Sequence, residues 1–242
     1  MAQKILVLSG KGGVGKSTAA ACLATALARL GKTSLLIDAD VGFRSLDLIL
    51  GVGSEAVYNW LDVINANCDG EAAPVRVSEY VSLLCAPSQA DGITAGDFSR
   101  LLETYDGGFD YILADAPAGS GEFHGILASV CDCALLVVTP DPVCVRSADS
   151  AMRKALAVNP ELDTKLLINR FNRLEVLAGR QLKLDDVIDI TRTQLIGVIP
   201  ESDSIRLLSS GEQLTKYASS AFDRCAKRLA GESVPFRIKD FY

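Results

Sequence analysis

The sequence predicts an α/β fold, in which a mostly parallel, twisted sheet carries helices on both faces. Three observations support this prediction. Short apolar runs of strand length recur along the chain, helical patterns lie between them, and most of the runs end in polar residues. Because ligands of such sheets bind beyond the carboxyl ends of the strands, these polar endings also predict one shared site.

Seven apolar runs have the length of strands that are buried on both faces. In chain order they are KILVLSG (4–10), SLLIDAD (34–40), VSLLCAP (81–87), DYILADAP (110–117), CALLVVTP (133–140), KLLINR (165–170) and LIGVIPE (195–201). Three helical patterns lie between or after them, over residues 17–30, 143–158 and 211–230. The alternation predicts βαβ units and therefore parallel strands.

The stretch GKGGVGKS at residues 10–17 matches the phosphate-binding pattern G-x-x-x-x-G-K-[ST]. It follows a predicted strand and precedes a predicted helix, which is the context that the motif requires. Its backbone N–H groups and the helix N-terminus are expected to hold phosphate oxygens, with Lys16 at the β- and γ-phosphates and Thr18 at the α-phosphate. The loop residues assigned to nucleotide binding are Gly10, Lys11, Gly12, Gly13, Val14, Gly15, Lys16, Ser17 and Thr18.

Carboxylates at two strand ends suit the chemistry of a metal-bound nucleotide. Ser17 and Asp115 are expected to hold Mg²⁺, with Asp115 acting through water as a Walker-B aspartate does. After Asp115, the DAPAG turn is expected to sense a γ-phosphate through its backbone amides. Asp38 and Asp40 are two residues apart at another strand end, so one can support the metal shell while the other orients the attacking water.

Here the sequence resembles a known family, the MinD/ParA ATPases with a deviant Walker A loop, on the segment KGGVGKS. The branch that selects the septum site is the most similar, on LLIDADVGFRSLDLILGV, VYNWLDVI, LLCAPSQ, DYILADAPAG, INRFN and LIGVIPESDSI. The resemblance extends from about residue 3 to about residue 238 and therefore covers nearly the whole chain.

The resemblance implies roles for individual residues. Lys11 is expected to reach the phosphates of the partner in an ATP-dependent homodimer, and Asp40 to orient the attacking water. Asn169 corresponds to the base-recognition position. The strand-end residue Arg170 and the loop residues Pro200, Glu201 and Asp203 complete the expected nucleotide contacts.

The resemblance also implies a function. The chain is expected to be a slow, partner-stimulated, Mg²⁺-dependent ATPase that acts as a spatial switch in septum-site selection, with hydrolysis resetting the dimer. Division-inhibitor and ATPase-activating proteins of the MinC and MinE kind are the expected partners. The catalytic set is Lys11, Lys16, Asp38 and Asp40.

Other functions remain open at this point. A ParA-type partition ATPase would bind nonspecific DNA, which the net charge of −6 disfavours. A flagellar-number regulator of the FlhG kind carries an N-terminal segment for which the chain, starting at its first strand, leaves no room. An iron–sulfur carrier needs paired cysteines, and DAPAG has none. A nucleotide-locked scaffold would fit if Asp40 proved irrelevant to turnover.

Composition adds further expectations. With 49% hydrophobic and 22% charged residues and no repeat or linker, residues 1–242 are expected to form one ATPase domain. Seven scattered cysteines without a C-x-x-C pair predict reduced, buried thiols in the cytoplasm. His124 is expected on the surface of a helix and Trp60 in packing.

The short tail at residues 236–242 ends the sequence. Members of the family usually continue past a segment like PFRIKDFY into a basic amphipathic helix that binds the membrane. Seven residues are too short for such a helix, and Arg237 and Lys239 are offset by Asp240 and the terminal carboxylate. Membrane contact at the inner face of the cell membrane is therefore expected to be weak or dependent on a partner.

Overall fold

The computed structural model describes residues 1–119, 121–211 and 213–236. The prediction of weak membrane contact concerns the tail at residues 236–242, and residues 237–242 lie outside the described range. Among the described residues, no helix has both the length and the low polarity needed to cross a bilayer.

The described residues form an eight-stranded sheet in the order β3-β4-β2-β5-β1-β6-β7-β8. Every pair of neighbouring strands is parallel except β3 and β4, so the predicted fold class is confirmed. The strands are β1 (Gln3–Leu8), β2 (Ser34–Asp38), β3 (Val75–Arg76), β4 (Val81–Leu84), β5 (Tyr111–Asp115), β6 (Cys133–Val138), β7 (Asp163–Phe171) and β8 (Gln194–Pro200). The sequence did not predict the edge strand β3, because two residues show no period.

The helices of the described residues are α1 (Lys16–Arg29), α2 (Ser45–Leu50), α3 (Trp60–Ile64), α4 (Ala95–Tyr105), α5 (Glu122–Val130), α6 (Pro142–Val158), α7 (Arg173–Leu177), α8 (Leu184–Thr191), α9 (Asp203–Arg206) and α10 (Lys216–Leu229), with short 3₁₀ turns at Gly70–Ala72 and Leu208–Ser210. Among these helices, side-chain caps begin α3, α4, α6, α7 and α10.

The ends of two predicted helices can be compared with their caps. The prediction of a helix over 143–158 agrees with α6, where Asp141 accepts a hydrogen bond from Cys144 and Pro142 occupies the first turn. The predicted start of the last helix at residue 211 was wrong. The Thr215 side chain accepts from Ala218 and caps α10, which therefore begins at Lys216.

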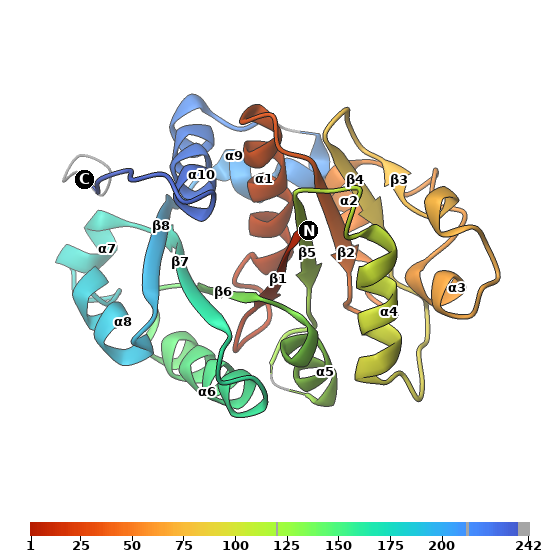
Figure 1. The fold of residues 1–242 in the computed structure, drawn as a ribbon. Coiled ribbons are helices and arrows are strands. Elements are labelled where there is room, and N and C mark those ends of the chain that lie inside the picture. The colour runs from red at the N-terminus through yellow and green to blue at the C-terminus, as the bar shows by residue number, and fades with distance from the viewer. Residues whose placement is uncertain (120, 212, 237–242) are drawn as a thin grey trace.

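The helices form two layers, one on each face of the sheet (Figure 1). Helices α1, α2 and α10 lie together on one face, and α4, α5, α6 and α8 cover the other. Each central strand is thus covered on both sides, which explains why β2, β5 and β6 are buried throughout. Such strands show continuous apolar runs rather than alternation.

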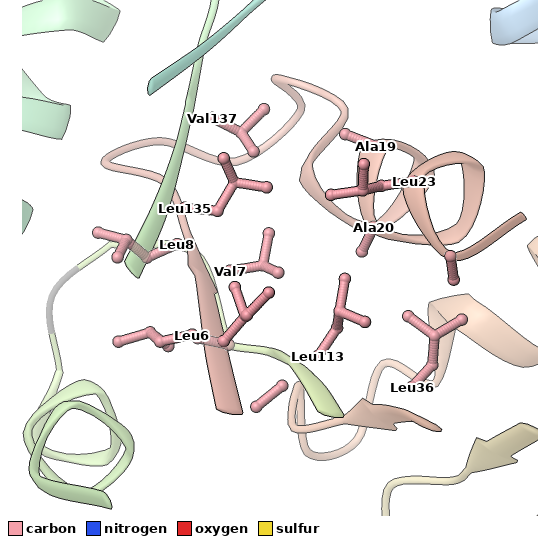
Figure 2. Close-up of a cluster of buried hydrophobic side chains, with 14 of the residues drawn as sticks. Leu6, Val7, Leu8, Ala19, Ala20, Leu23, Leu36, Leu113, Leu135 and Val137 are labelled. Carbon is pink, nitrogen blue, oxygen red and sulfur yellow. The ribbon is translucent and has the colours of Figure 1, made fainter. Parts of the chain in front are cut away.

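The core on the α1 side is built from central strands and small helical residues (Figure 2). Val7, Leu113 and Leu135 belong to neighbouring strands, and Leu23 faces them from α1. All four are fully buried. Burial of one leucine or valine side chain stabilises the folded state by about 2 kcal/mol. Alanines along the buried face of α1, such as Ala20, let the helix approach the sheet closely, so the loop before α1 is held firmly over the end of β1.

The strand order decides where a ligand can bind. β1 is central, with β5 on one side and β6 on the other, and the chain moves to opposite halves of the sheet from this point. A crevice forms at such a switch point, beyond the carboxyl ends of the strands. The glycine-rich loop follows β1 there, and Asp115 ends the adjacent strand β5.

Candidate nucleotide site

The glycine-rich loop joins β1 to α1 over residues 9–15. Gly15 is the N-cap of α1 and has φ of 85°, a left-handed conformation that favours glycine. A Cβ at Gly15 would also meet the Nδ2 of Asn169 at 2.5 Å. A Cβ at Gly10 would overlap the backbone of Ser147 in α6. Close packing against α6, rather than a special backbone torsion angle, therefore requires glycine at position 10.

Lys16 begins α1 and points inward. Its Nζ lies 2.5 Å from Oδ1 of Asp115, and both side chains are buried, with exposed fractions of 7% and 0%. The ammonium thus lies under the loop, where a phosphate chain would lie against the N-terminus of α1. The first N–H groups of a helix have no partner within the helix, and they favour an anion.

Ser17 and Thr18 follow Lys16 in the first turn of α1. The Ser17 hydroxyl accepts a hydrogen bond from the hydroxyl of Ser45 in α2 at 3.1 Å. Ser17 and Thr18 line a hollow over the loop, and Lys11 stands exposed at its edge. We call this hollow the phosphate hollow; it is lined by Ser9, Lys11, Gly12, Gly13, Val14, Gly15, Lys16, Ser17, Thr18, Asp40, Ser45, Ile49, Ala118 and Arg170.

Two loops flank the phosphate hollow. We call residues 38–47 switch I and residues 115–119 switch II. The switch II backbone is tied to the start of the glycine-rich loop, because the N–H of Gly119 donates to the Ser9 carbonyl at 3.0 Å. Asp115, the first residue of switch II, is paired in register with Asp38, the first residue of switch I. The two loops therefore start side by side.

Asp38 is a buried carboxylate that shapes switch I. Its two carboxylate oxygens accept hydrogen bonds from the backbone N–H groups of Asp40 and Leu46, both at 3.1 Å. Burial raises the pKa of Asp38 to about 6; the nearby Asp115 carboxylate adds to the rise, while the two N–H donors and Lys16 oppose it. Both oxygens of this side chain are directed into its own loop rather than into the phosphate hollow.

Asp40 is half-buried and lines the phosphate hollow. Burial raises the pKa of its carboxyl group, and Asp115 adds to the rise, whereas Lys16 opposes it. The spacing of the two aspartates at this strand end does not distinguish them, whereas the family resemblance assigns the water-orienting role to Asp40. The structure brings both to one rim but directs only Asp40 toward the ligand space.

The residues predicted to hold Mg²⁺ fit a metal with few protein ligands. Within the described ranges, Oδ2 of Asp115 is buried without a hydrogen-bond partner, and Ser17 lines the phosphate hollow. Magnesium usually keeps several waters and uses one or two protein oxygens beside phosphate oxygens. No cluster of three or more His, Cys, Asp or Glu ligands occurs in residues 1–119, 121–211 and 213–236.

A second hollow continues from the phosphate hollow, and we call it the base hollow. The two hollows are adjacent, because both are lined by Gly15, Thr18 and Arg170. The base hollow holds all the predicted base-side residues and is lined by Gly15, Thr18, Asn169, Arg170, Pro200, Glu201, Ser202, Asp203, Ile205 and Arg206. Its walls come from the ends of β7 and β8, next to the start of α1.

Two neighbouring residues of β7 act differently at this junction. Asn169 is buried, and its Nδ2 donates to the carbonyl of Val14 at 2.8 Å, so it supports the glycine-rich loop from beneath. Its Oδ1 has no hydrogen-bond partner among the described residues. Arg170 is exposed and has φ of 54°, which is unusual for a residue other than glycine and falls at an irregularity in the β7–β8 pairing.

Several residues that line the two hollows were not assigned from the sequence, and His124, which lines neither hollow, lies in a different environment from the one expected. The unassigned residues are Ser9, Ser45, Ile49, Ser202, Ile205 and Arg206, whereas Ala118 belongs to the DAPAG turn that was expected to approach the γ-phosphate. Ser202 and Ile205 belong to the segment LIGVIPESDSI, in which only Pro200, Glu201 and Asp203 were assigned contacts, and Arg206 directly follows that segment. Ser45 reaches Ser17 only through the fold. The expectation of a surface position for His124 was wrong: it lies in α5 as expected but is only 6% exposed.

Known proteins are similar to this chain over most of its length. The model of the ParA family, described as NUBPL iron-transfer P-loop NTPase, matches residues 1–167. The septum site-determining protein MinD of Synechocystis sp. is 36% identical over 243 residues, which cover 96% of this chain and 91% of that protein.

Solved structures of MinD proteins are also similar to this chain. A chain of the MinC:MinD cell division protein complex of Aquifex aeolicus is 37% identical with a TM-score of 0.88, and 98% of each chain is covered. The septum site-determining protein MinD complexed with Mg-ADP from Pyrococcus horikoshii is 25% identical with a TM-score of 0.80, covering 95% of this chain and 96% of that one. From the family model and the near-complete alignment with these relatives, the chain belongs to the ParA family of P-loop NTPases and, within it, to the MinD septum site-determining proteins.

Proposed function

We propose that this chain is a Mg²⁺-dependent ATPase whose ATP-bound form is a homodimer and which acts as a spatial switch in septum-site selection. One observation carries the proposal: the two lysines of the loop lie in different environments. Lys16 is buried against Asp115, whereas Lys11 is exposed at the edge of the phosphate hollow. An exposed lysine beside a phosphate site can serve a second subunit, which Lys16 cannot do.

In the proposed reaction, the loop N–H groups and Lys16 bind the phosphate chain of ATP, and the base hollow orients the base. Asp40 orients the attacking water, a role for which its place in the phosphate hollow suits it better than Asp38. Mg²⁺, held by Ser17 and through water by Asp115, would neutralise charge on the phosphates. Switch II presents its backbone to the γ-phosphate and changes its contacts when that group leaves.

Hydrolysis is proposed to be slow until a partner completes the site. The Aquifex aeolicus relative is titled as a complex with MinC, and we propose a division inhibitor of that kind as one partner of this chain. A second, activating protein of the MinE kind is proposed by analogy with the family. We also propose that residues 1–242 work as one ATPase domain.

The proposal is tested by measuring the mass of the protein by light scattering with ATP and Mg²⁺, with ADP and Mg²⁺, and without nucleotide. A dimer with ATP alone is expected, together with slow phosphate release. A monomer under all three conditions, despite ATP binding in calorimetry, would contradict the switch. The same experiment with EDTA tests the dependence on Mg²⁺.

The alternative functions differ in the surface that the ATP-bound form uses. Sedimentation with anionic vesicles and, in parallel, with duplex DNA distinguishes septum-site selection from DNA partition. Strong ATP-dependent cosedimentation with DNA would favour the partition ATPase instead. For an iron carrier, the described structure offers no matching site, because six of the seven cysteines are buried and dispersed.

A further inference from the structure

Trp60 is attached to switch I. It begins α3, is fully buried, and its indole N–H donates a 2.9 Å hydrogen bond to the backbone carbonyl of Asp38. The carboxylate of the same Asp38 accepts the N–H groups of Asp40 and Leu46. The indole therefore fixes the residue around which switch I folds.

Trp60 also belongs to a cluster of three aromatic rings. It stacks on Phe123 with ring centroids 6.0 Å apart, and both rings meet Phe98 edge-on at 5.3 Å. Phe123 lies in the first turn of α5, the helix that follows switch II. Such pairs stabilise beyond simple burial of area and prefer defined geometries. A movement of α5 thus changes the surroundings of the indole.

His124 follows Phe123 and is attached to switch II. Its Nε2 lies 2.8 Å from the carbonyl of Pro117, and its Nδ1 is buried with no hydrogen-bond partner in the part of the chain that the structure describes. Because a carbonyl only accepts, Nε2 carries the proton and donates. Pro117 immediately precedes Ala118, which lines the phosphate hollow. The imidazole therefore holds the switch II backbone at the residue before Ala118.

We infer that Trp60 and His124 are positioning residues for ATP hydrolysis, joined through the ring of Phe123, and that they couple switch I to switch II. The inference rests on the proposed ATPase function and adds a pathway by which the two loops adjust together. Coupling of this kind requires packed contacts between elements that move as units. Here the contacts run from Asp38 to Trp60, to Phe123, to His124 and to Pro117.

The coupling is tested first without nucleotide, by amide hydrogen exchange. His124→Leu keeps an apolar volume but removes the donor to Pro117, whereas His124→Gln can keep a donor near the position of Nε2. The Leu variant is expected to speed exchange in switch I at residues 39–47, none of which His124 touches through a hydrogen bond, by about tenfold or less. The Gln variant is expected to stay near the wild type. Exchange that changes only around switch II would overturn the coupling.

Kinetics provide the second test. Trp60→Phe keeps a ring against Phe98 and Phe123 but removes the donor to Asp38. Loss of either donor is expected to lower kcat by about three- to tenfold, with the Kd for ADP within about twofold of the wild type. In the variant with both Trp60→Phe and His124→Leu, kcat should fall by a factor smaller than the product of the two factors measured for the single variants. Simple multiplication of the two effects would show independent sites and overturn the coupling.

A matched control separates positioning from stability. Tyr105 at the end of α4 donates a 2.8 Å hydrogen bond to the carbonyl of Gly70 and precedes the amino end of β5, whereas both switches begin at the carboxyl ends of β2 and β5. Tyr105→Phe removes one hydrogen bond from an aromatic side chain, as Trp60→Phe does. It should lower the melting temperature without changing kcat. If all three donor-loss variants lower kcat equally, the role of Trp60 and His124 is structural only and the inference is wrong.

The two tests keep this inference distinct from the proposed function. If the wild type neither binds nor hydrolyses ATP, the proposed function fails, while the exchange experiment still decides whether His124 acts on switch I. If ATP is hydrolysed but His124→Leu matches His124→Gln in both exchange and kcat, the inference fails and the ATPase stands.

Discussion

Lys16 and Asp115 form a buried ion pair, with Nζ and Oδ1 2.5 Å apart, although 99 residues separate them in the chain. The pair joins the first turn of α1 to the end of β5. Asp115 lies beside Asp38 in the sheet register, so Lys16 is also the cation that balances these neighbouring carboxylates. The residue expected to bind phosphate is therefore also the partner of a buried carboxylate.

The first prediction concerns this pair. Lys16→Met keeps most of the side-chain length but leaves the Asp115 carboxylate buried without its cation. We expect the free energy of unfolding of the ligand-free protein to fall by about 3 kcal/mol. Nucleotide binding should be lost as well. Urea denaturation and calorimetry with ADP measure the two effects.

The matched control for Lys16→Met is Lys32→Met. Lys32 pairs with Asp110 at 3.4 Å, but both side chains are about 40% exposed. Exposed pairs are screened by water, so this change should alter the free energy of unfolding by less than about 1 kcal/mol. Equal losses in the free energy of unfolding from the two variants would show that burial does not make the Lys16–Asp115 pair more costly to break.

The second prediction concerns Lys11. Lys11→Ala should keep nucleotide affinity within about threefold, because an exposed lysine contributes little to a single subunit's site. It should abolish the ATP-dependent dimer, since the proposed contact lies in the partner. Light scattering with ATP and Mg²⁺ measures the mass. A normal dimer of the Lys11→Ala protein would remove Lys11 from the proposed interface.

The third prediction separates the two aspartates of switch I. Asp40→Ala should retain nucleotide binding and the dimer but lower phosphate release by about 100-fold, because water is no longer oriented. Asp38→Asn should lower the melting temperature of the ligand-free protein, because its carboxylate holds the N–H groups of Asp40 and Leu46. If Asp40→Ala hydrolyses ATP at the normal rate, the water-orienting role moves to another residue.

The fourth prediction concerns pH. Burial lowers the pKa of His124 below its ordinary value, and Lys16 adds to this, although the hydrogen bond to Pro117 opposes it. Below pH 6.5 the unfolded chain then binds a proton more readily than the folded protein does. The contribution of His124 to stability is therefore present above about pH 6.5 and is lost as the pH falls toward the pKa of the folded state.

The single histidine makes this prediction simple to check. The imidazole signals in NMR spectra should titrate with a midpoint below that of the unfolded chain. The difference in unfolding free energy between the wild type and His124→Gln should shift against the wild type as the pH falls from 7 to 5. A midpoint at or above the unfolded value would show that the imidazole is not held neutral by its surroundings.

The sequence by itself determined the features that depend on neighbours in the chain. Strand and helix segments follow from short-range periodicity, and the spacing of Gly10, Gly15, Lys16 and Ser17 specifies a phosphate loop between a strand and a helix. Asp115 could be assigned because a buried strand places its last residue at the ligand-binding edge of the sheet. These assignments need no knowledge of strand order.

Only the tertiary structure decided which distant residues meet. Asn169 supports the carbonyl of Val14 across 155 positions, and Trp60 meets the carbonyl of Asp38 because α3 packs beside the end of β2. His124 is buried because α5 packs between its neighbours α4 and α6, a result that its local pattern did not indicate. Such contacts depend on the order of strands in the sheet and on the packing of the helices over it. Since periodicity reports only which face of an element is apolar, it cannot specify the partner that covers that face.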